Sequence, residues 1–447
     1  MPVSPARASA FDILLRVETQ DAYASELLHS TRLDKLSSAD RGLTTEIVMG
    51  VLRWQSRLDE TIAAASSRRL AKLDPEVLTA LRMAAYQMHF LTRVPASAAV
   101  NESVKLIKRA RKVSAAPFAN AVLRKLADKP PIRIDDDFDP TAEDIARGYA
   151  HPQWIVQRWA KQFGIDAALQ VCRQDQSERP PSLRFEDPTA EAELITSEIE
   201  LSPGRVVTGA RSLIDCNVGR LTHTGAFRNG RVMIQDEGSQ LVALLVGRGA
   251  RLLDCCAAPG GKTALLAARN PDAEIIATEI HPHRTDLLRK RVHAPNVKVM
   301  QADVTKLPVE SAFDRVLVDV PCSGTGTLAR NPEIKWRLNP EDLDDLHRKQ
   351  VAILTAALRH LAPCGLAVYS TCSLEREENE AVIEEVLADH PNYHLLAVRD
   401  ELGRLCASGE LAWQDLDSLV SGKFLRTLPG VHPCEGFFAA LIERSDH

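Results

Sequence analysis

Leu252-Leu-Asp-Cys-Cys-Ala-Ala-Pro-Gly-Gly-Lys-Thr263 is the stretch that decides the fold of the larger part of the chain. In it, an apolar run passes into a glycine-rich turn and then into the start of a helix. Two glycines let the backbone approach a ligand closely, and the free N–H groups of a helix N-terminus can receive that ligand. A phosphate-binding P-loop would need glycine where this chain has Cys256, so the pattern disfavours a nucleoside triphosphatase.

From residue 232 onward, short apolar runs alternate with segments of helical pattern. The runs that we expect to be strands span residues 251–255, 274–278, 297–300, 315–320 and 366–370. The predicted helices span residues 263–269, 284–292, 341–361 and 378–388. Such alternation is typical of a parallel, doubly wound sheet, whose ligands bind beyond the carboxyl ends of the strands. We therefore predict a Rossmann-like α/β domain over residues 232–447.

Acidic residues follow the second and third of these predicted strands. Glu279 ends the second strand, 18 residues after Gly261, and Asp303 ends the third. A carboxylate at the end of strand two can accept hydrogen bonds from both ribose hydroxyls of a nucleoside, and Asp303 is placed to meet an adenine amino group. Together with the glycine-rich turn, the two acids predict a site for an adenine nucleoside.

Two of the nine cysteines stand just after strands four and five. The fourth strand runs into Asp319-Val-Pro-Cys322-Ser-Gly, and the fifth runs into Tyr369-Ser-Thr-Cys372-Ser. If these strands pair, their ends lie ~5 Å apart, and both thiols face the ligand side of the sheet. Packed thiols or a redox pair would look the same in sequence, because cysteine is a common core residue. The position of both cysteines at strand ends favours a functional role.

A thiolate suits one reaction in particular, the methylation of carbon 5 of cytosine. That carbon is a poor nucleophile, but addition of a thiolate to C6 converts the ring to an enamine and makes C5 nucleophilic. C5 can then take the methyl group of S-adenosylmethionine, and loss of the C5 proton with elimination of the thiolate restores the ring. Asp319 is in position to assist the addition near N3 and N4, and Lys262 is a cation that would favour the thiolate.

Residues 1–130 are predicted to form an all-α bundle. Apolar residues recur at helical spacing over 5–128, Ser37-Ser-Ala-Asp40 is a helix start signal, and Pro75 fits the first turn of a helix. Residues 1–133 carry 21 Lys and Arg against 13 Asp and Glu, a net charge of +8, whereas the whole chain carries −5. A basic module on an acidic body suits RNA contact, although a solvated helix face would have the same composition. The densest basic run comprises Lys105, Lys108, Arg109, Arg111 and Lys112.

Between the bundle and the sheet we expect two further parts. Residues 131–145, rich in proline and acid, are predicted to be a linker. Residues 146–231 are predicted to form a small α/β RNA-binding subdomain, with a helix at 152–163 and strands at 182–185, 204–207 and 212–215. The sequence of residues 401–433 indicates only a polar segment before the final strand.

These motifs together resemble the RsmB (Sun, Fmu) family of ribosomal RNA methyltransferases. The most specific feature is the combination of Pro-Cys-Ser after strand four with Thr-Cys-Ser after strand five. Further stretches that resemble the family are Gln235-Asp-Glu-Gly-Ser-Gln240, Arg330-Asn-Pro-Glu333, Glu378-Asn-Glu380 and Gly436-Phe-Phe-Ala439. The N-terminal part resembles a NusB-type RNA-binding bundle in Arg7-Ala-Ser-Ala10, Asn101-Glu102 and Phe118-Ala-Asn-Ala-Val-Leu-Arg124.

The resemblance implies S-adenosylmethionine as the cofactor and 5-methylcytosine in small-subunit (16S) rRNA as the product, at the family site cytosine 967. It implies that Cys372 is the nucleophile and that Cys322 assists release of the methylated product. The implied cofactor contacts are Cys256, Ala257, Ala258, Pro259, Gly260, Gly261, Lys262, Glu279, Asp303 and Asp319. The chain departs from the family pattern at Glu279, Val320 and Arg376, where Asp, Ala and Pro are commoner. None of these departures removes a catalytic group.

Two other functions stay open from the sequence. The first is the same chemistry on tRNA or another RNA, against which the NusB-like bundle favours rRNA. The second is an RNA-binding or antitermination factor with an inert methyltransferase half, which the intact Cys322, Cys372 and Asp319 disfavour. DNA cytosine methylation is also disfavoured, because enzymes of that class resemble the Pro-Cys site but lack the Thr-Cys site.

Composition argues against several further classes. No apolar run approaches the ~20 residues of a membrane span, and the first residues lack the apolar region of a signal peptide. No cysteine and histidine cluster has the spacing of a zinc site, so no metal is predicted. We therefore expect a cytoplasmic protein with reduced thiols.

Overall fold

The structure is a computed structural model, and it describes residues 3–28, 33, 35–129, 132, 140–214, 218–308 and 313–446. The chain divides into two compact units. The first contains Met1–Ser177 with Leu328–Arg337, and the second contains Glu178–Thr327 with Leu338–His447. Most of the predicted linker at 131–145 lies outside the described residues, and the four-part division expected from the sequence stays a prediction.

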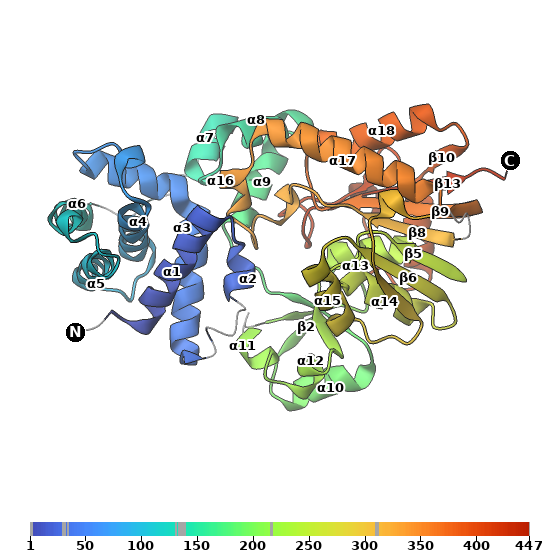
Figure 1. The fold of residues 1–447 in the computed structure, drawn as a ribbon, viewed down its shortest axis with the longest axis horizontal. Coiled ribbons are helices and arrows are strands. Elements are labelled where there is room, and N and C mark those ends of the chain that lie inside the picture. The colour runs from blue at the N-terminus through green and yellow to red at the C-terminus, as the bar shows by residue number, and fades with distance from the viewer. Residues whose placement is uncertain are drawn as a thin grey trace. The chain divides into compact units, whose positions relative to one another are not determined.

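Helices form the first unit throughout its described residues, which confirms the predicted all-α N-terminal part (Figure 1). Ser37 caps α3 by accepting a hydrogen bond from the backbone N–H of Asp40, and Pro75 occupies the first turn of α4, so both predicted start signals are used. The α-helices are α1 (Pro5–Gln20), α2 (Ala24–Leu28), α3 (Ser38–Ala65), α4 (Pro75–Phe90), α5 (Ala96–Arg109), α6 (Ala116–Ala127), α7 (Ala142–Gly148), α8 (Gln153–Phe163), α9 (Ile165–Asp175) and α16 (Ile334–Arg337).

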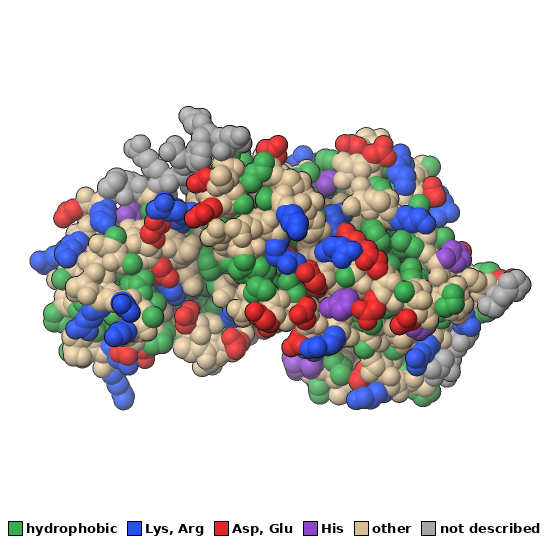
Figure 2. Space-filling model, turned by 90° about the horizontal axis from the view of Figure 1, so that it is seen from above, with side chains coloured by type: hydrophobic (Ala, Val, Ile, Leu, Met, Phe, Trp, Pro, Cys, Tyr) green, Lys and Arg blue, Asp and Glu red, His purple; other side chains and the backbone are tan. Residues whose placement is uncertain are grey.

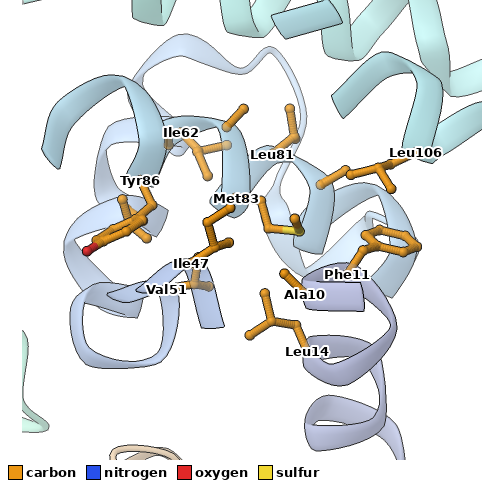
Figure 3. Close-up of a cluster of buried hydrophobic side chains, with 14 of the residues drawn as sticks. Ala10, Phe11, Leu14, Ile47, Val51, Ile62, Leu81, Met83, Tyr86 and Leu106 are labelled. Atoms are coloured by element: carbon orange, nitrogen blue, oxygen red, sulfur yellow. The ribbon is translucent and has the colours of Figure 1, made fainter. Parts of the chain in front are cut away.

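The core of the first unit is a cluster of apolar side chains from α1, α3, α4 and α5 (Figure 3). Phe11, Ile47 and Met83 are each at most 2% exposed, and burying a side chain of this size stabilises the fold by about 1.5–3 kcal/mol. Close approach of α3 and α4 requires glycine at Gly50, because a Cβ atom there would lie 1.9 Å from the Tyr86 ring.

Residues 328–337 come from the later part of the chain but pack within this helical unit. Trp336 Nε1 donates to the Leu52 carbonyl at 2.6 Å, and Lys335 Nζ donates to the Arg53 carbonyl at 3.1 Å. Glu333 Oε1 accepts from the Ala24 N–H at 2.8 Å. These side chains are held by α2 and α3, and the segment contains the Arg330-Asn-Pro-Glu333 motif.

Several cations of the basic run, which covers the end of α5 and the residues just after it, are engaged by acids of the same unit. Lys105 pairs with Glu102, Arg109 with Asp12, and Lys112 with Asp74 and Glu76. Exposed pairs of this kind contribute at most about 1 kcal/mol, so they leave the side chains available to other partners. On the face that Figure 2 shows, lysine and arginine side chains are interspersed with acids.

The second unit carries a small antiparallel sheet of order β2-β3-β1-β4 and a larger main sheet. The strands of the small sheet are β1 (Ser182–Phe185), β2 (Leu201–Pro203), β3 (Arg211–Leu213) and β4 (Val232–Ile234). The helices of this unit are α10 (Pro188–Thr196), α11 (Val218–Leu221), α12 (Gly225–Arg228), α13 (Glu237–Leu245), α14 (Gly261–Arg269), α15 (Pro282–Arg291), α17 (Pro340–Leu358), α18 (Glu380–Asp389) and α19 (Val398–Ala407).

The predicted strand at 204–207 is wrong, because residues 205–206 form a bend and Val207 makes an isolated antiparallel bridge to Leu411. Gly204 N–H donates to the Ala210 carbonyl at 2.8 Å. The N–H groups of Val206 and Val207 both donate to Glu237 Oε2, at 2.6 and 2.8 Å. A carboxylate therefore takes the hydrogen bonds that a neighbouring strand would have taken, while the two valines bury their side chains in the core.

The main sheet has the order β11-β12-β13-β9-β8-β5-β6-β7, and β10 pairs with β13. Strands β9, β8, β5, β6 and β7 are parallel to their neighbours in this series, which confirms the predicted doubly wound fold. The strands are β5 (Arg251–Asp254), β6 (Glu274–Glu279), β7 (Val297–Gln301), β8 (Phe313–Asp319), β9 (Leu361–Thr371), β10 (Tyr393–Leu396), β11 (Val420–Ser421), β12 (Phe424–Arg426) and β13 (Phe438–Arg444).

Alternate residues of the central strands pack on opposite faces of the main sheet. Leu317 of β8 belongs to the apolar cluster that includes residues of α13, α14 and α19. Its neighbours Val316 and Val318 belong to the cluster that includes residues of α17 and α18. The sheet is thus covered on both faces, which is why its strands appear in the sequence as continuous apolar runs.

The antiparallel edge of this sheet is not evident from the sequence. Strand β13 pairs antiparallel with β9, and β12 pairs antiparallel with β13. The interval 401–433, which permitted no interpretation, holds most of α19 and the short strands β11 and β12. Among the described residues, no helix is long and apolar enough to cross a membrane.

Candidate active site

The glycine-rich turn lies between β5 and α14, at the edge of the sheet where the parallel strands end. Gly260 has φ +106°, and a Cβ atom there would meet Val292 and Leu288 side-chain atoms at 2.7 and 2.9 Å, so glycine is required on both grounds. The turn is fixed to β6 by a hydrogen bond from Ala257 N–H to the Thr278 carbonyl. Arg284 of α15 donates to the Ala258 carbonyl at 3.0 Å.

Asp254, the last residue of β5, lies directly before this turn and was not singled out from the sequence. Its carboxyl group is buried, and Oδ2 accepts from Thr263 Oγ1 at 2.7 Å. Within the described parts of the chain, Oδ1 has no hydrogen-bond partner. Burial raises the pKa of Asp254 to about 7, against the hydrogen bond from Thr263, which lowers it.

The two acids predicted to contact a nucleoside lie at the ends of adjacent strands. In the parallel pair β6–β7, Glu279 lies opposite Gln301, two residues before Asp303. Glu279 is 3% exposed, and its Oε1 accepts from the His281 N–H at 3.0 Å. Asp303 Oδ1 accepts from Thr305, through both its N–H and its hydroxyl. The Thr305 hydroxyl bond is the main cause that lowers the pKa of Asp303.

The two cysteines at the strand ends are in contact. Strands β8 and β9 pair in parallel with Asp319 opposite Ser370, so the loops that follow them lie side by side. Cys322 Sγ lies 3.2 Å from Cys372 Sγ, and the Cys372 N–H donates to Cys322 Sγ at 3.3 Å. The hydrogen bond with Cys372, followed by burial, raises the pKa of Cys322 well above its usual value. Cys322 is therefore a neutral thiol that can donate to its neighbour.

Lys262 and Asp319 form an ion pair beside the thiols. Lys262 Nζ lies 2.8 Å from Asp319 Oδ2, and Asp319 Oδ1 accepts from Ser370 Oγ at 2.7 Å. Burial lowers the pKa of Lys262, but the charges of Asp319 and Cys372 and the Asp319 hydrogen bond outweigh it, so the pKa is raised. The ammonium group also lies 5.2 Å from the centre of the Phe437 ring, within the range of a cation–π contact.

A second layer of polar residues behind the cysteines was not assigned from the sequence. Glu378 and Asn379, seen there only as part of a resembling motif, hydrogen-bond residues of both cysteine loops. The Arg376 that departs from the family pattern pairs with Glu384 and adds no contact to either cysteine among the interactions of the described residues.

The structure combines a doubly wound sheet, a glycine-rich turn after β5, acids at the ends of the next two strands and a facing pair of thiols. This combination defines an S-adenosylmethionine-dependent RNA methyltransferase. Residues 242–443 match the family described as 16S rRNA methyltransferase RsmB/F, and residues 4–128 match the NusB family. The chain belongs to the RsmB family of 16S rRNA methyltransferases, with a NusB-like N-terminal part.

Curated relatives align along most of the chain. A probable ribosomal RNA small subunit methyltransferase B of Bacillus subtilis is 33% identical, covering 88% of this chain and 90% of that protein. The ribosomal RNA small subunit methyltransferase B of Pseudomonas putida is 31% identical, covering 83% and 86%. A putative methyltransferase of Mycobacterium tuberculosis is 33% identical, covering 99% and 97%. Because these alignments cover most of this chain and most of each relative, they assign the family to the two units together.

Solved structures share the fold. The crystal structure of PH0851 aligns with a TM-score of 0.77 at 23% identity, covering 99% of this chain and all of that chain. A methyltransferase homolog protein from Pyrococcus horikoshii aligns with a TM-score of 0.54 at 25% identity, covering 69% of this chain and all of that one. These likenesses concern the arrangement of helices and strands.

Proposed function

We propose that this enzyme methylates carbon 5 of a cytosine in 16S rRNA through a covalent bond between Cys372 Sγ and C6 of the base. The observation that supports this most is the contact of Cys372 with the neutral thiol of Cys322 at 3.2 Å, beside the Lys262–Asp319 pair. A thiolate with a proton donor next to it is the arrangement needed for addition to C6 and later elimination. The proposed base follows the family site, cytosine 967.

The residues after β5, β6 and β7 fit the cofactor. The free N–H groups at the start of α14, the buried Oδ1 of Asp254 that lacks a partner among described residues, and the carboxylate of Glu279 form a set of donors and acceptors suited to an amino acid and a ribose. We assign the cofactor contacts to residues 256–262, Glu279, Asp303 and Asp319. S-adenosylmethionine supplies the electrophilic methyl group when bound.

Each residue near the cysteines has a distinct proposed part in the reaction. The Cys372 thiolate attacks C6, and Asp319 stabilises the protonated ring near N3 and N4 during that addition. Lys262 stays protonated, holds Asp319 Oδ2 and adds positive charge beside the thiols. After methyl transfer, the C5 proton passes to solvent as the C6–S bond breaks, and the Cys322 thiol gives its proton to the departing Cys372 sulfur, which frees the methylated base.

The N-terminal unit carries the part of the proposal that concerns RNA binding. A paired base hides its C6 face, so the target cytosine must be unpaired or flipped out before Cys372 can reach it. We assign the backbone contacts to the NusB-like bundle and to the small sheet of residues 182–234. Work on ribosomal RNA is consistent with a cytoplasmic enzyme, the location that we propose.

The test is bisulfite mapping of 16S rRNA, free and in the small subunit, after incubation with the protein and S-adenosylmethionine. The proposal expects one new 5-methylcytosine, at an unpaired position. Methylation of tRNA with none on 16S rRNA would move the substrate to tRNA, and labelled methyl groups on uridine or on base nitrogens would refute the cytosine-C5 chemistry.

A further inference from the structure

Glu378 bridges the two cysteine loops from behind. It ends a short 3-10 helix (Arg376–Glu378) that precedes α18, and it is fully buried. Its Oε1 accepts from the backbone N–H of Ser323 at 2.8 Å. Its Oε2 accepts from the hydroxyls of Ser323 and Ser373. Ser323 directly follows Cys322 and Ser373 directly follows Cys372, so one carboxyl group is hydrogen-bonded to both loops.

Asn379 holds the Cys372 loop on both sides of the thiol. Its Oδ1 accepts from Thr371 Oγ1 at 2.5 Å, and its Nδ2 donates to the Ser373 carbonyl at 2.9 Å. Thr371 and Ser373 are the residues immediately before and after Cys372. The backbone that carries the thiol is thus fixed at two points by one side chain.

Gln350 of α17 completes the same arrangement around Cys322. Its Nε2 donates to the Pro321 carbonyl at 2.9 Å and to Glu378 Oε1 at 2.9 Å. Pro321 precedes Cys322, and Ser323, which follows it, is bound by Glu378. Each thiol therefore sits between two anchored neighbours, and Glu378 is the one side chain of this set that joins both loops.

We propose that Glu378 is a positioning residue that sets the separation of the Cys322 and Cys372 sulfurs, with Asn379 and Gln350 fixing each loop to it. This inference rests on the proposed function in one respect, that both thiols act on the same base. Addition by one sulfur and proton donation by the other require both within reach of one ring. A displacement of about 1 Å can reduce a rate by about 10²-fold.

Satisfying a buried carboxyl group is a purely structural need, and its four donors, which are two hydroxyls, one backbone N–H and one side-chain amide, would meet it. A structural role alone predicts a loss of stability on substitution, without a selective effect on the distance between the sulfurs. A positioning role predicts that the sulfurs separate while the rest of the sheet and the cofactor turn stay intact.

The test compares the wild type with Glu378→Ala, Glu378→Gln and Glu384→Ala. Glutamine keeps an oxygen for the Ser323 N–H and Gln350, and its amide can donate to the serine hydroxyls, which rotate to accept. Glu384 lies nearby on α18 and is exposed, so Glu384→Ala is the matched control. The first readout is the rate of disulfide formation on adding diamide, in which the two thiols lose two protons and two electrons and diamide is reduced to the hydrazine.

We expect Glu378→Ala to slow disulfide formation at least tenfold and to lower kcat for methyl transfer about 10²-fold, with S-adenosylmethionine binding unchanged. Glu378→Gln should recover most of both rates, and Glu384→Ala should match the wild type. Disulfide formation at the wild-type rate in Glu378→Ala would overturn the inference. If Glu378→Ala fails to fold, Ser373→Ala, which removes the Cys372 side of the bridge, must show the same slowing.

The two readouts separate this inference from the proposed function. The disulfide rate reports the sulfur separation without any RNA, so it tests Glu378 even in an enzyme that transfers no methyl group. A wild type that forms the disulfide rapidly but methylates no cytosine would defeat the proposed function and leave the positioning role standing. If the wild type methylates cytosine and Glu378→Ala equals it in both the disulfide rate and the methyl-transfer rate, the proposed function stands and the positioning role is refuted.

Discussion

Lys262 Nζ and Asp319 Oδ2 lie 2.8 Å apart, joining the first turn of α14 to the end of β8. The pair links the cofactor turn to the loop that carries Cys322. The side chains are 12% and 28% exposed, so water screens the interaction only in part. The strand-end acid is thereby held in one orientation, with its second oxygen bound by Ser370.

Replacing Asp319 by asparagine should lower kcat about 10²-fold or more, because the variant loses the acid that assists addition to C6. Single-turnover methyl transfer to 16S rRNA is the measurement. Asp314→Asn is the matched control, since Asp314 lies on the same strand at its other end and receives the N–H groups of Ala250 and Arg251. If kcat falls equally in both variants, the effect of Asp319→Asn comes from a destabilised β8 and not from the loss of the assisting acid.

Replacing Cys322 by alanine should leave addition intact and slow release of the product. The neutral thiol of Cys322 lies 3.2 Å from the Cys372 sulfur and can give it a proton, so its removal should trap enzyme and RNA as a covalent complex. A denaturing gel of labelled RNA with the protein would show the complex as a shifted band. A Cys322→Ala variant that turns over at the wild-type rate, with no shifted band, would contradict this role.

The stability of the second unit should depend on pH through Asp254. Burial raises the pKa of this carboxyl from 3.8 to about 7 in the folded protein. The folded state thus keeps a proton that the unfolded chain releases, so stability falls as pH rises from about 4 to about 7 and levels off above that. The full loss is about 4 kcal/mol at most.

Asp254→Asn keeps a neutral side chain of the same shape and should remove this pH dependence. In the absence of cofactor, urea unfolding should show the variant more stable than the wild type at pH 8 and close to it at pH 4. The same difference at both pH values would mean that Asp254 is ionised throughout, in conflict with its burial.

Binding of 16S rRNA should weaken with salt, since phosphate contacts release counterions. Lys108 lies in the basic run of α5, three residues after the Glu102-paired Lys105. Lys108→Ala should weaken binding and reduce the slope of log K against log salt by about 1. Lys423→Ala, between β11 and β12, serves as the control. An unchanged slope in Lys108→Ala would remove α5 from the RNA-binding surface.

The parts of the site that sequence predicts are those that depend on local order along the chain. Cys322 and Cys372 each follow an apolar run, and parallel strands end at one edge of a sheet, so their proximity follows from the fold class. Gly260 is needed by a turn of few residues. Nothing beyond neighbouring residue types is required for either prediction.

The remaining parts depend on contacts that sequence order does not reveal. Glu378 meets Ser323 from 55 positions away, and Glu237 takes the N–H groups of Val206 and Val207 that were expected to pair with a strand. Such bonds depend on side-chain conformations in the folded structure, which the order of residues along the chain does not reveal. The packing of residues 328–337 into the helical unit likewise needs the tertiary structure.

The most direct test of the account is to map the covalent adduct on RNA in which the target cytosine carries fluorine at C5. Fluorine cannot leave as a proton, so elimination stops and the adduct persists after methyl transfer. Tryptic mass spectrometry of the wild-type complex should place the RNA on the peptide containing Cys372, with no adduct in Cys372→Ala and the same adduct in Cys322→Ala. An adduct on Cys322, or methylation of normal RNA by Cys372→Ala, would contradict the assignment of the nucleophile.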